Sequence, residues 1–332
     1  MKTFRIKESN DRIIMGKQGD YKLKLVNYRN KNSNQMERIG FILDEYVVDV
    51  QDAYKSMLQA VNKNEQLEII PAEPDLFFKI GTPAIERAIA AYDFVKKNQE
   101  ELTLLRMEQR NIIFGPPIRN PQKIICVGRN YAAHAKEMDS DIPTYPVLFA
   151  KFANALIGPN DPIEKTSFTE KLDYEGELVV VIGKEAKHVK REDAHHYISG
   201  YAIGNDTSAR DLQKRTPQWL QGKSIDRTTP IGPWIVTTEE IKDPINLAVR
   251  SYVNGELRQE GNTRDFIFDV PTLIEFITSL ITLQPGDLIM TGTPDGVGFG
   301  MNPPQFLSNG DIVTIEIDKI GKIENKVMDA QL

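Results

Sequence analysis

The sequence predicts a mixed α+β protein that is mainly β, with a small N-terminal α/β domain at residues 1–118 and a larger domain at residues 119–332. At 332 residues, the chain exceeds the ~150 residues of an average domain, which allows two domains or one large domain with an appendage. A stretch rich in glycine and proline at residues 111–121 marks the boundary. After it, short β-branched runs alternate with turn residues, as in strand-rich folds.

The N-terminal region combines short strands with one helix. Residues 22–26 alternate charged and apolar side chains, and apolar residues recur through 38–50, which predicts a few short strands. Residues 83–110 are predicted to be helical because Ile85, Ala88 and Tyr92 follow one another at helical spacing. The polar part of this segment after Lys96 is also consistent with a solvated turn.

The larger domain is predicted to be built mainly of strands. They are expected at residues 123–127, 178–182, 198–203, 234–236, 247–253, 287–290 and 312–317. The one strong helix candidate is residues 267–283, where Phe276, Ile277 and Leu280 share an apolar face. Pro271 is tolerated there because it falls in the first turn.

The composition excludes several classes of protein. There are 41 Lys+Arg against 47 Asp+Glu, a net charge of −6, and no basic run that would neutralise several phosphates, so no nucleic-acid partner is expected. Cys126 is the single cysteine, which excludes an internal disulfide and a thiolate metal cage. The N-terminus lacks a signal-peptide core, and the longest apolar run, residues 178–182, is far shorter than the ~20 residues that cross a bilayer. We therefore expect a soluble, cytoplasmic protein that does not enter a membrane.

The most informative segment is acidic. In a strand, alternate side chains share a face, so Asp173, Glu175 and Glu177 are expected to stand side by side. Like charges repel, and burial makes the repulsion worse unless a cation or protons compensate. The alternative interpretation is an edge strand with a solvated acidic outer face.

Asp206 follows the next apolar run, residues 198–203. A strand that placed it beside Glu175 and Glu177 would create an all-oxygen site, suited to Mg²⁺, Mn²⁺ or Ca²⁺ rather than zinc. Alternatively, the Asn-Asp-Thr-Ser segment at residues 205–208 is a good helix start, with Asp206 or Thr207 as the capping residue.

One of the four histidines lies in a distinctive context. Residues 130–138 can form a short helix in which His134 and Glu137, three apart, are neighbours. A carboxylate that accepts from one imidazole nitrogen leaves the other able to take a proton from water. A plain surface pair is the alternative. The remaining histidines, in a charged stretch expected to be an exposed connection, are His188, His195 and His196.

Two further segments give weaker signals. Lys223 is flanked by glycine and aromatic residues. Residues 291–298 are rich in glycine and follow an apolar strand, but they lack the lysine and the spacing of a P-loop, so nucleotide binding is not supported. Close approach of this loop to a small ligand is one interpretation, and an ordinary loop is the other.

Several motifs occur together in one order. They are residues 124–134 (IICVGRNYAAH), 173–178 (DYEGEL), 205–213 (NDTSARDLQ), 222–226 (GKSID), 253–259 (VNGELRQ), 285–287 (PGD), 291–294 (TGTP) and 310–311 (GD). As an ordered set, over roughly residues 120–328, the sequence resembles the fumarylacetoacetate hydrolase family. The resemblance implies that family's mixed β-sandwich roll for the larger domain, after a small variable domain, and a homodimer.

The resemblance also implies a set of site residues. Glu175, Glu177 and Asp206 would bind Mg²⁺ or Mn²⁺. His134 and Glu137 would form a water-activating dyad on a short lid. The residue that would face the reacting carbonyl or enolate is Lys223, and those that would hold carboxylate or oxo groups of the substrate are Arg129, Gln213 and Thr293.

The implied function is that of a metal-dependent hydrolase. It would cleave the C–C bond of small anionic acylpyruvate-type (1,3-diketo acid) substrates through a metal-bound enolate. The alternative on the same site is a decarboxylase of 2-oxo diacids such as oxaloacetate, or a dienoate isomerase. A rival from another class is an inactive binding or regulatory homologue. Residues 151–154 (KFAN) and 227–228 (RT) depart from the family pattern, which leaves the identity of the substrate open.

Overall fold

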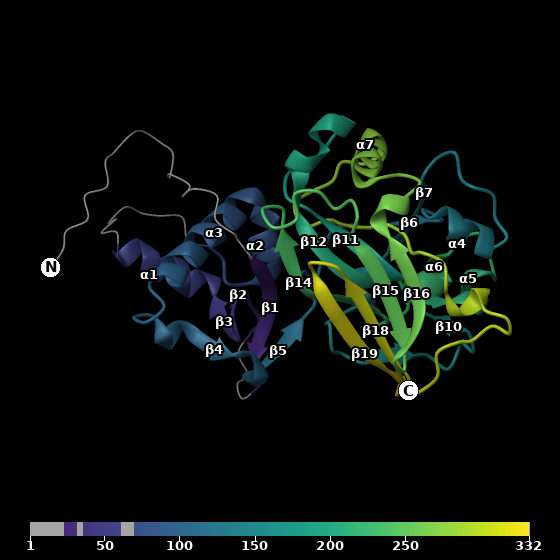
Figure 1. Ribbon diagram of the computed structural model, residues 1–332, viewed down its shortest axis with the longest axis horizontal. Coiled ribbons are helices and arrows are strands. Elements are labelled where there is room, and N and C mark those ends of the chain that lie inside the picture. Colours follow the sequence, from purple (N-terminus) through teal and green to yellow (C-terminus); the bar gives the residue numbers. More distant parts are fainter. Residues whose placement is uncertain (1–22, 32–35, 61–69, 332) are drawn as a thin grey trace.

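One large sheet contains strands from the N-terminal region and from the larger domain in the computed structural model, which describes residues 23–31, 36–60 and 70–331 (Figure 1). Strand β1 (Lys24–Asn30) pairs antiparallel with β14 (Thr229–Thr237). This pairing joins the N-terminal strands to those of the larger domain in a sheet of 12 strands among the described residues. The domain boundary after residue 118 stays a prediction.

The strand order follows the large sheet from the N-terminal side. It is β4 (Arg106–Glu108), β3 (Tyr46–Asp49), β2 (Arg38–Leu43), β1, β14, β12 (Ile198–Asn205), β11 (Gly176–Ile182), β17 (Leu288–Met290), β6 (Ile124–Gly128) and β7 (Val147–Lys151), with β5 (Ile112–Gly115) beside β1 and β8 (Leu156–Ile157) beside β14.

A second sheet lies against the first (Figure 1). Its order is β16 (Glu256–Asn262), β15 (Ala248–Val253), β18 (Ile312–Ile317), β19 (Gly321–Asp329) and β9 (Ile163–Lys165). A short ladder of β10 (Leu172–Asp173) and β13 (Ser208–Ala209) lies beside the acidic segment.

Strand β11 is buried on both faces, which explains its unbroken apolar run. Leu178 and Val180 belong to the apolar core between the two sheets, together with Ile315 of β18. Val179 belongs to a second core, which the N-terminal helices cover, together with Phe77. The strand that leads into the acidic segment is therefore fixed by apolar packing from both sides.

The helices are few and mostly short. The N-terminal ones are α1 (Val50–Ala60), α2 (Pro74–Ile80) and α3 (Thr82–Lys97), and the later ones are α4 (Ala132–Glu137), α5 (Arg210–Gln213), α6 (Leu220–Lys223) and α7 (Val270–Leu280). Short 3₁₀ helices occur at Thr103–Leu105, Gln109–Asn111, Ala153–Ala155, Arg191–Tyr197, Thr263–Asp265 and Gly298–Gly300. Among the described helices, none is long and apolar enough to cross a membrane.

The predicted fold class is confirmed, since the structure is a strand-rich α+β fold with an N-terminal β/α region. Each strand predicted in the larger domain is present within a few residues. The helix predicted at residues 83–110 is wrong beyond Lys97, because residues 106–108 form β4 against β3, in line with the solvated-turn alternative. Helix α7 begins at Val270, later than predicted, because the Asp269 carboxylate caps it by accepting from the Thr272 N–H at 3.0 Å. Lys22, the first residue of the predicted strand at 22–26, lies outside the described residues.

Candidate active site

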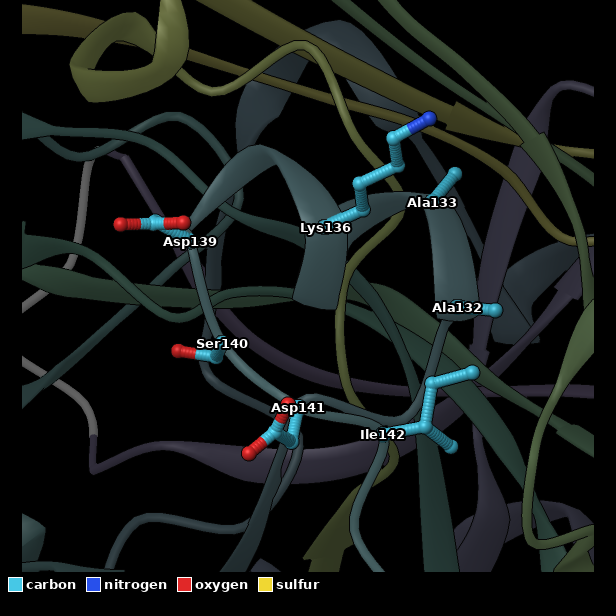
Figure 2. A pocket seen from close by; sticks show the side chains of 7 residues that line it. All are labelled: Ala132, Ala133, Lys136, Asp139, Ser140, Asp141 and Ile142. Atoms are coloured by element: carbon cyan, nitrogen blue, oxygen red, sulfur yellow. The ribbon is translucent and has the colours of Figure 1, made fainter.

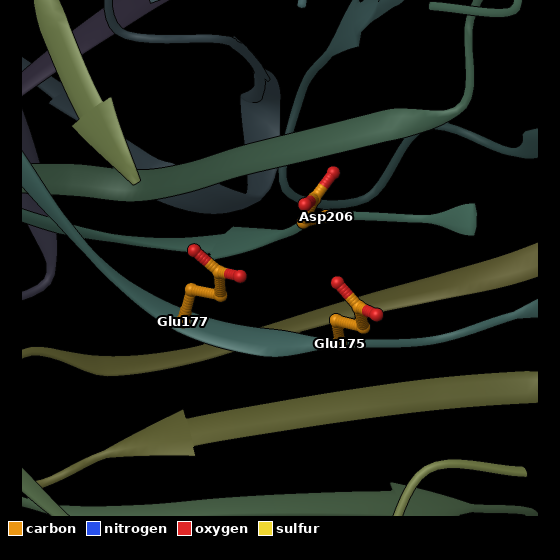
Figure 3. Close-up of side chains that lie close together, drawn as sticks. All are labelled: Glu175, Glu177 and Asp206. Atoms are coloured by element: carbon orange, nitrogen blue, oxygen red, sulfur yellow. The ribbon is translucent and has the colours of Figure 1, made fainter. Parts of the chain in front are cut away.

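Three buried carboxylates meet where β11 begins and β12 ends. Gly176 pairs with Asn205 in the antiparallel ladder, and the Asp206 N–H donates to the Glu175 carbonyl at 2.9 Å. The ligand atoms of Glu175, Glu177 and Asp206 all lie within 4.8 Å of one another. Figure 3 shows Glu175 and Glu177 on one side of their strand, next to Asp206. The interpretation as a solvated acidic edge is therefore wrong, since all three are buried.

Asp173 does not join this cluster. Residues 174 and 175 interrupt the strand between β10 and β11, so the side-chain alternation that was expected to place Asp173 beside Glu175 is lost. Instead, the Asp173 carboxylate is 2.8 Å from Nε of Arg210 and accepts from the backbone N–H groups of Tyr174, Gly298 and Phe299. The expectation of three neighbouring acidic side chains from one strand is wrong at its first member.

Cations surround two of the clustered carboxylates. Lys223 Nζ lies 2.7 Å from Glu175 Oε2 and 2.6 Å from Asp206 Oδ2. Lys151 Nζ is 2.8 Å from Asp206 Oδ1, and an Arg210 nitrogen is 2.7 Å from Glu175 Oε1.

Asp206 does not cap a helix. Helix α5 begins at Arg210 without a side-chain cap, so the capping interpretation of residues 205–208 is wrong.

The two glutamates have opposite electrostatic surroundings. Burial opposes the ionisation of Glu175, but Lys223 and Arg210 outweigh it and hold the pKa of this carboxyl well below its usual range. Burial raises the pKa of Glu177 well above its usual range, and the nearby Asp206 and Glu175 raise it further. Among the described residues, the Glu177 side chain accepts one hydrogen bond, from the Gly292 N–H at 2.8 Å.

The donor set suits a hard divalent cation. It contains carboxylate oxygens alone, which Mg²⁺ and Mn²⁺ prefer over softer ligands. Within the described part of the chain, Glu177 forms no ion pair, so its buried carboxyl lacks a partner that would stabilise the charged form, which a bound cation would supply. The residues that would hold the ion are those predicted from the sequence.

His134 and Glu137 form a partly enclosed pair on α4. His134 Nδ1 lies 3.0 Å from Glu137 Oε2, and the other Glu137 oxygen accepts from the Gly296 N–H at 2.8 Å. His134 is 5% exposed, so the two residues do not form a plain surface pair. Because Nδ1 faces the carboxylate, Nε2 is the ring nitrogen left for proton transfer.

The predicted substrate contacts occupy different surroundings. Arg129 is half-buried in a left-handed conformation (φ 58°), with its guanidinium 5.9 Å from the centre of the Trp219 ring. The Gln213 side chain accepts from Arg210 at 3.2 Å. The Thr293 hydroxyl donates to the Gly176 carbonyl at 3.0 Å. Their roles in substrate binding stay predictions.

Two buried cations were missed as site residues by the sequence analysis. Lys151 was noted only as part of a departure from the family pattern, and Arg210 only as a member of a motif. Each ammonium or guanidinium group is almost fully buried against carboxylates. No local periodicity identifies them, because their partners are far away in the sequence. The sole signal was the family pattern, since Arg210 lies in a shared motif and Lys151 begins a segment that departs from the pattern.

A surface hollow lies next to this site without containing it. Figure 2 shows its walls, which come from the outer side of α4 and the segment that follows. The lining residues are Ala132, Ala133, Lys136, Asp139, Ser140, Asp141 and Ile142. None of the clustered carboxylates and neither member of the His134–Glu137 pair lines it. The chemistry is therefore located on the inner side of α4.

Residues 123–328 match the family model described as fumarylacetoacetate (FAA) hydrolase C-terminal. The chain belongs to the fumarylacetoacetate hydrolase family, as the order of its motifs predicted, and it is an enzyme of that superfamily.

Two similar proteins carry the same activity in their names. "Oxaloacetate tautomerase YisK" of Bacillus subtilis is 42% identical over 294 residues, which is 87% of this chain and 95% of the relative. "Oxaloacetate tautomerase fahd2, mitochondrial" of Xenopus laevis is 42% identical over 261 residues, 78% of this chain and 79% of the relative. These names point away from the acylpyruvase prediction and toward the alternative of a 2-oxo diacid enzyme or isomerase.

Solved structures agree in fold. The fumarylacetoacetate hydrolase from Exiguobacterium antarcticum has a TM-score of 0.72 at 34% identity and covers 93% of this chain and 100% of its own. A maleylpyruvate hydrolase from Sphingobium sp. SYK-6, solved with manganese(II) and pyruvate, has a TM-score of 0.66 at 28% identity, with coverage of 93% and 100%.

Proposed function

We propose that this protein is a metal-dependent tautomerase of small 2-oxo diacids of the oxaloacetate type, which interconverts their enol and keto forms. The observation that carries the proposal is the match to relatives named as oxaloacetate tautomerases over as much as 95% of the relative. The buried carboxylates beside an enclosed His–Glu pair support it. This choice replaces C–C hydrolysis as the first candidate.

The reaction needs a site for negative charge and a group that exchanges protons. Ketonisation removes a proton from the enol oxygen and adds one to the neighbouring carbon, so the charge passes through an enolate. Mg²⁺ or Mn²⁺ held by Glu175, Glu177 and Asp206 would supply a Lewis acid that stabilises charge on the 2-oxo oxygen. Lys223, 2.7 Å from Glu175, adds a positive charge at the same place.

His134 is the proposed proton-exchange group. Glu137 accepts from Nδ1, which fixes the imidazole tautomer and leaves the Nε2 lone pair available to take up or return a proton. Enol–keto exchange needs no attacking water, whereas C–C hydrolysis does. The same pair can therefore serve a tautomerase by moving a proton between carbon and oxygen of one substrate.

A second candidate function is hydrolysis of acylpyruvates. The similarity to a maleylpyruvate hydrolase solved with manganese and pyruvate favours it. Decarboxylation of oxaloacetate is a further option, since loss of carbon dioxide also leaves an enolate, that of pyruvate, whose charge the same site would stabilise. The homodimer and the cytoplasmic location stay predictions, and one of the similar proteins is named as mitochondrial.

The deciding experiment compares three reactions with one preparation of enzyme at saturating Mg²⁺ or Mn²⁺. Ketonisation is followed by the loss of the ultraviolet absorbance of enol-oxaloacetate, decarboxylation by pyruvate formation, and hydrolysis by cleavage of acetylpyruvate. Rates with metal alone are subtracted. We expect ketonisation to be the fastest. Rapid acetylpyruvate cleavage without ketonisation would contradict the proposal and favour the hydrolase.

A further inference from the structure

The loop of residues 296–300 lies directly against the proposed proton-exchange pair. The Gly296 N–H donates to Glu137 Oε1 at 2.8 Å. At Gly300 a Cβ atom would collide with the Cγ atom of Glu137, so the backbone itself forms the wall behind this side chain. The position of Glu137, and through it the orientation of His134, therefore depends on where this loop is held.

The same loop is fixed from its other side by Asp173. The Asp173 carboxylate accepts from the Gly298 N–H at 2.8 Å and from the Phe299 N–H at 3.0 Å. A Cβ atom at Gly298 would lie 2.8 Å from Asp173 Oδ1, so the loop backbone approaches the carboxylate as closely as only glycine allows. Two charge-assisted hydrogen bonds thus hold consecutive residues of the loop.

Asp173 is in turn held by Arg210, which also contacts the carboxylate cluster. The guanidinium lies 2.8 Å from Asp173 Oδ2 and 2.7 Å from Glu175 Oε1. All three side chains are buried, so the pairs are not screened by water. One continuous chain of contacts therefore runs from Glu175 through Arg210 and Asp173 to the loop.

We propose that Asp173 is a positioning residue, which holds the 296–300 loop so that Gly296 fixes Glu137 against His134. The inference rests on the proposed function, because it assigns His134 to proton exchange. In this role, Asp173 contacts neither the substrate nor the metal ion that Glu175, Glu177 and Asp206 would bind. It acts through the loop backbone, and its effect on turnover passes through Glu137.

This assignment explains why an acidic residue is buried away from the cluster. Burial raises the pKa of the Asp173 carboxyl, and Arg210 with the loop N–H groups offsets part of that penalty. An apolar residue would avoid the penalty, but it would leave the Gly298 and Phe299 N–H groups without their acceptor and remove one of the partners of the Arg210 guanidinium.

The test is a double-mutant cycle with Asp173→Asn and Glu137→Gln at saturating Mg²⁺. Misplacement of a proton-exchange group by about 1 Å can slow turnover by roughly 10²-fold, so Asp173→Asn is expected to lower kcat on that scale with little change in KM. Because Asp173 acts through Glu137, the double variant should turn over no more slowly than Glu137→Gln alone. Losses that multiply in the double variant would overturn the proposal, since a general structural defect gives that result.

A second readout needs no substrate. Amide hydrogen exchange of the 296–300 loop should be about tenfold faster in Asp173→Asn, which is the ratio expected for the loss of one charge-assisted hydrogen bond. Unchanged exchange in this loop would overturn the positioning role. If the wild-type protein showed no tautomerase activity, the proposed function would fall, and the exchange comparison alone would decide the role of Asp173.

The matched control is Asp211→Asn. Asp211 is also an aspartate of this region that accepts from a backbone N–H, that of Glu170, and from the Thr169 hydroxyl, but it does not contact the loop. We expect normal turnover and normal loop exchange in this control. Should Asp173→Asn fail to fold, as judged by circular dichroism, Asp173→Glu retains the charge for Arg210 but displaces the carboxylate. It should show the same pattern, and wild-type kcat and exchange in that variant would contradict the proposal.

Discussion

Lys223 and Glu175 form a buried ion pair, with Nζ 2.7 Å from Oε2 and the lysine side chain 2% exposed. The same ammonium lies 2.6 Å from Asp206 Oδ2, so one cation bridges two carboxylates of the cluster. Burial lowers the pKa of a lysine, but Asp206 and Glu175 outweigh this effect and raise the pKa of Lys223. Lys223 therefore stays charged, and its ammonium group contacts two of the three carboxylates that are proposed to bind the metal ion.

Replacement of Lys223 should lower the stability of the metal-free protein and raise its affinity for the metal ion. Lys223→Met removes one of two cations from each of two buried carboxylates, because Glu175 keeps Arg210 and Asp206 keeps Lys151. The metal-free protein should lose about 3 kcal/mol of unfolding free energy, measured by urea denaturation. Mn²⁺ should bind more tightly, because a competing cation is gone. The control is Lys322→Met, whose partner Glu324 is 3.4 Å away at an exposed position. Weaker Mn²⁺ binding in Lys223→Met would contradict this account of the ion pair.

Replacement of Glu177 should have the opposite effects on stability and on metal affinity. Glu177→Gln removes a buried carboxylate that forms no ion pair among the described residues, and the amide oxygen can still accept from Gly292. The metal-free protein should therefore unfold at the same or a higher temperature. The Kd for Mn²⁺ in calorimetry should rise by more than the ~10–100-fold that loss of an outer-shell partner costs. The control is the exposed Glu260→Gln, and equal Mn²⁺ affinity in both variants would exclude Glu177 as a ligand.

The parts of the fold with a strong local pattern could be predicted from the sequence. Strand β11 is buried on both faces, so its unbroken apolar run identified it. Strand β19 was missed because it buries only alternate residues, such as Ile323 and Val327, between charged ones. The pairing of β1 with β14 could not be predicted either, because no local pattern encodes which distant strands meet.

The candidate site divides in the same way. Glu175 and Glu177 were predicted to be neighbours from strand alternation, and this is confirmed. The same alternation did not predict the position of Asp173, since the chain leaves the strand at residues 174–175. No turn residue at these two positions indicates this interruption. Lys151 and Arg210 reach the cluster only through the tertiary fold, so their charges could not be counted from the sequence.

The cap of α7 makes stability depend on pH. Burial opposes ionisation of Asp269, but hydrogen bonds from Thr272 and the charge of Arg191 outweigh it, and the pKa of Asp269 is lowered from 3.8. A lowered folded-state pKa means that the contribution is complete above about pH 3.8 and is lost as the pH falls through the folded value. Asp269→Ala should therefore reduce unfolding free energy by about 1 kcal/mol at pH 7.

The measurement for this cap is urea denaturation between pH 7 and pH 3. The difference between wild type and Asp269→Ala should be constant at the higher pH values and shrink at the acid end of the range. Asp329→Ala, at an exposed position at the end of β19, serves as the control and should match wild type throughout. A difference that grew with acidity would contradict the assigned sign.

The last prediction concerns the His134–Glu137 pair, whose atoms lie 3.0 Å apart. In Glu137→Gln, the amide that meets Nδ1 can donate, which favours the imidazole tautomer with its proton on Nε2 and removes the proposed base. His134→Ala removes the ring itself. General acid–base catalysis contributes about 10²–10⁴-fold, so both variants should slow ketonisation on that scale while Mn²⁺ affinity changes little.

Lys136→Ala, on the outer side of the same helix, controls for disturbance of α4 and should retain wild-type turnover. Ketonisation and acetylpyruvate cleavage are measured for all variants at saturating Mg²⁺, with the rate of metal alone subtracted. If Glu137→Gln lost cleavage but kept ketonisation, the pair would activate water rather than move the substrate's proton. Wild-type ketonisation in His134→Ala would place proton exchange on another group, of which Lys223 is the nearest to the carboxylate cluster.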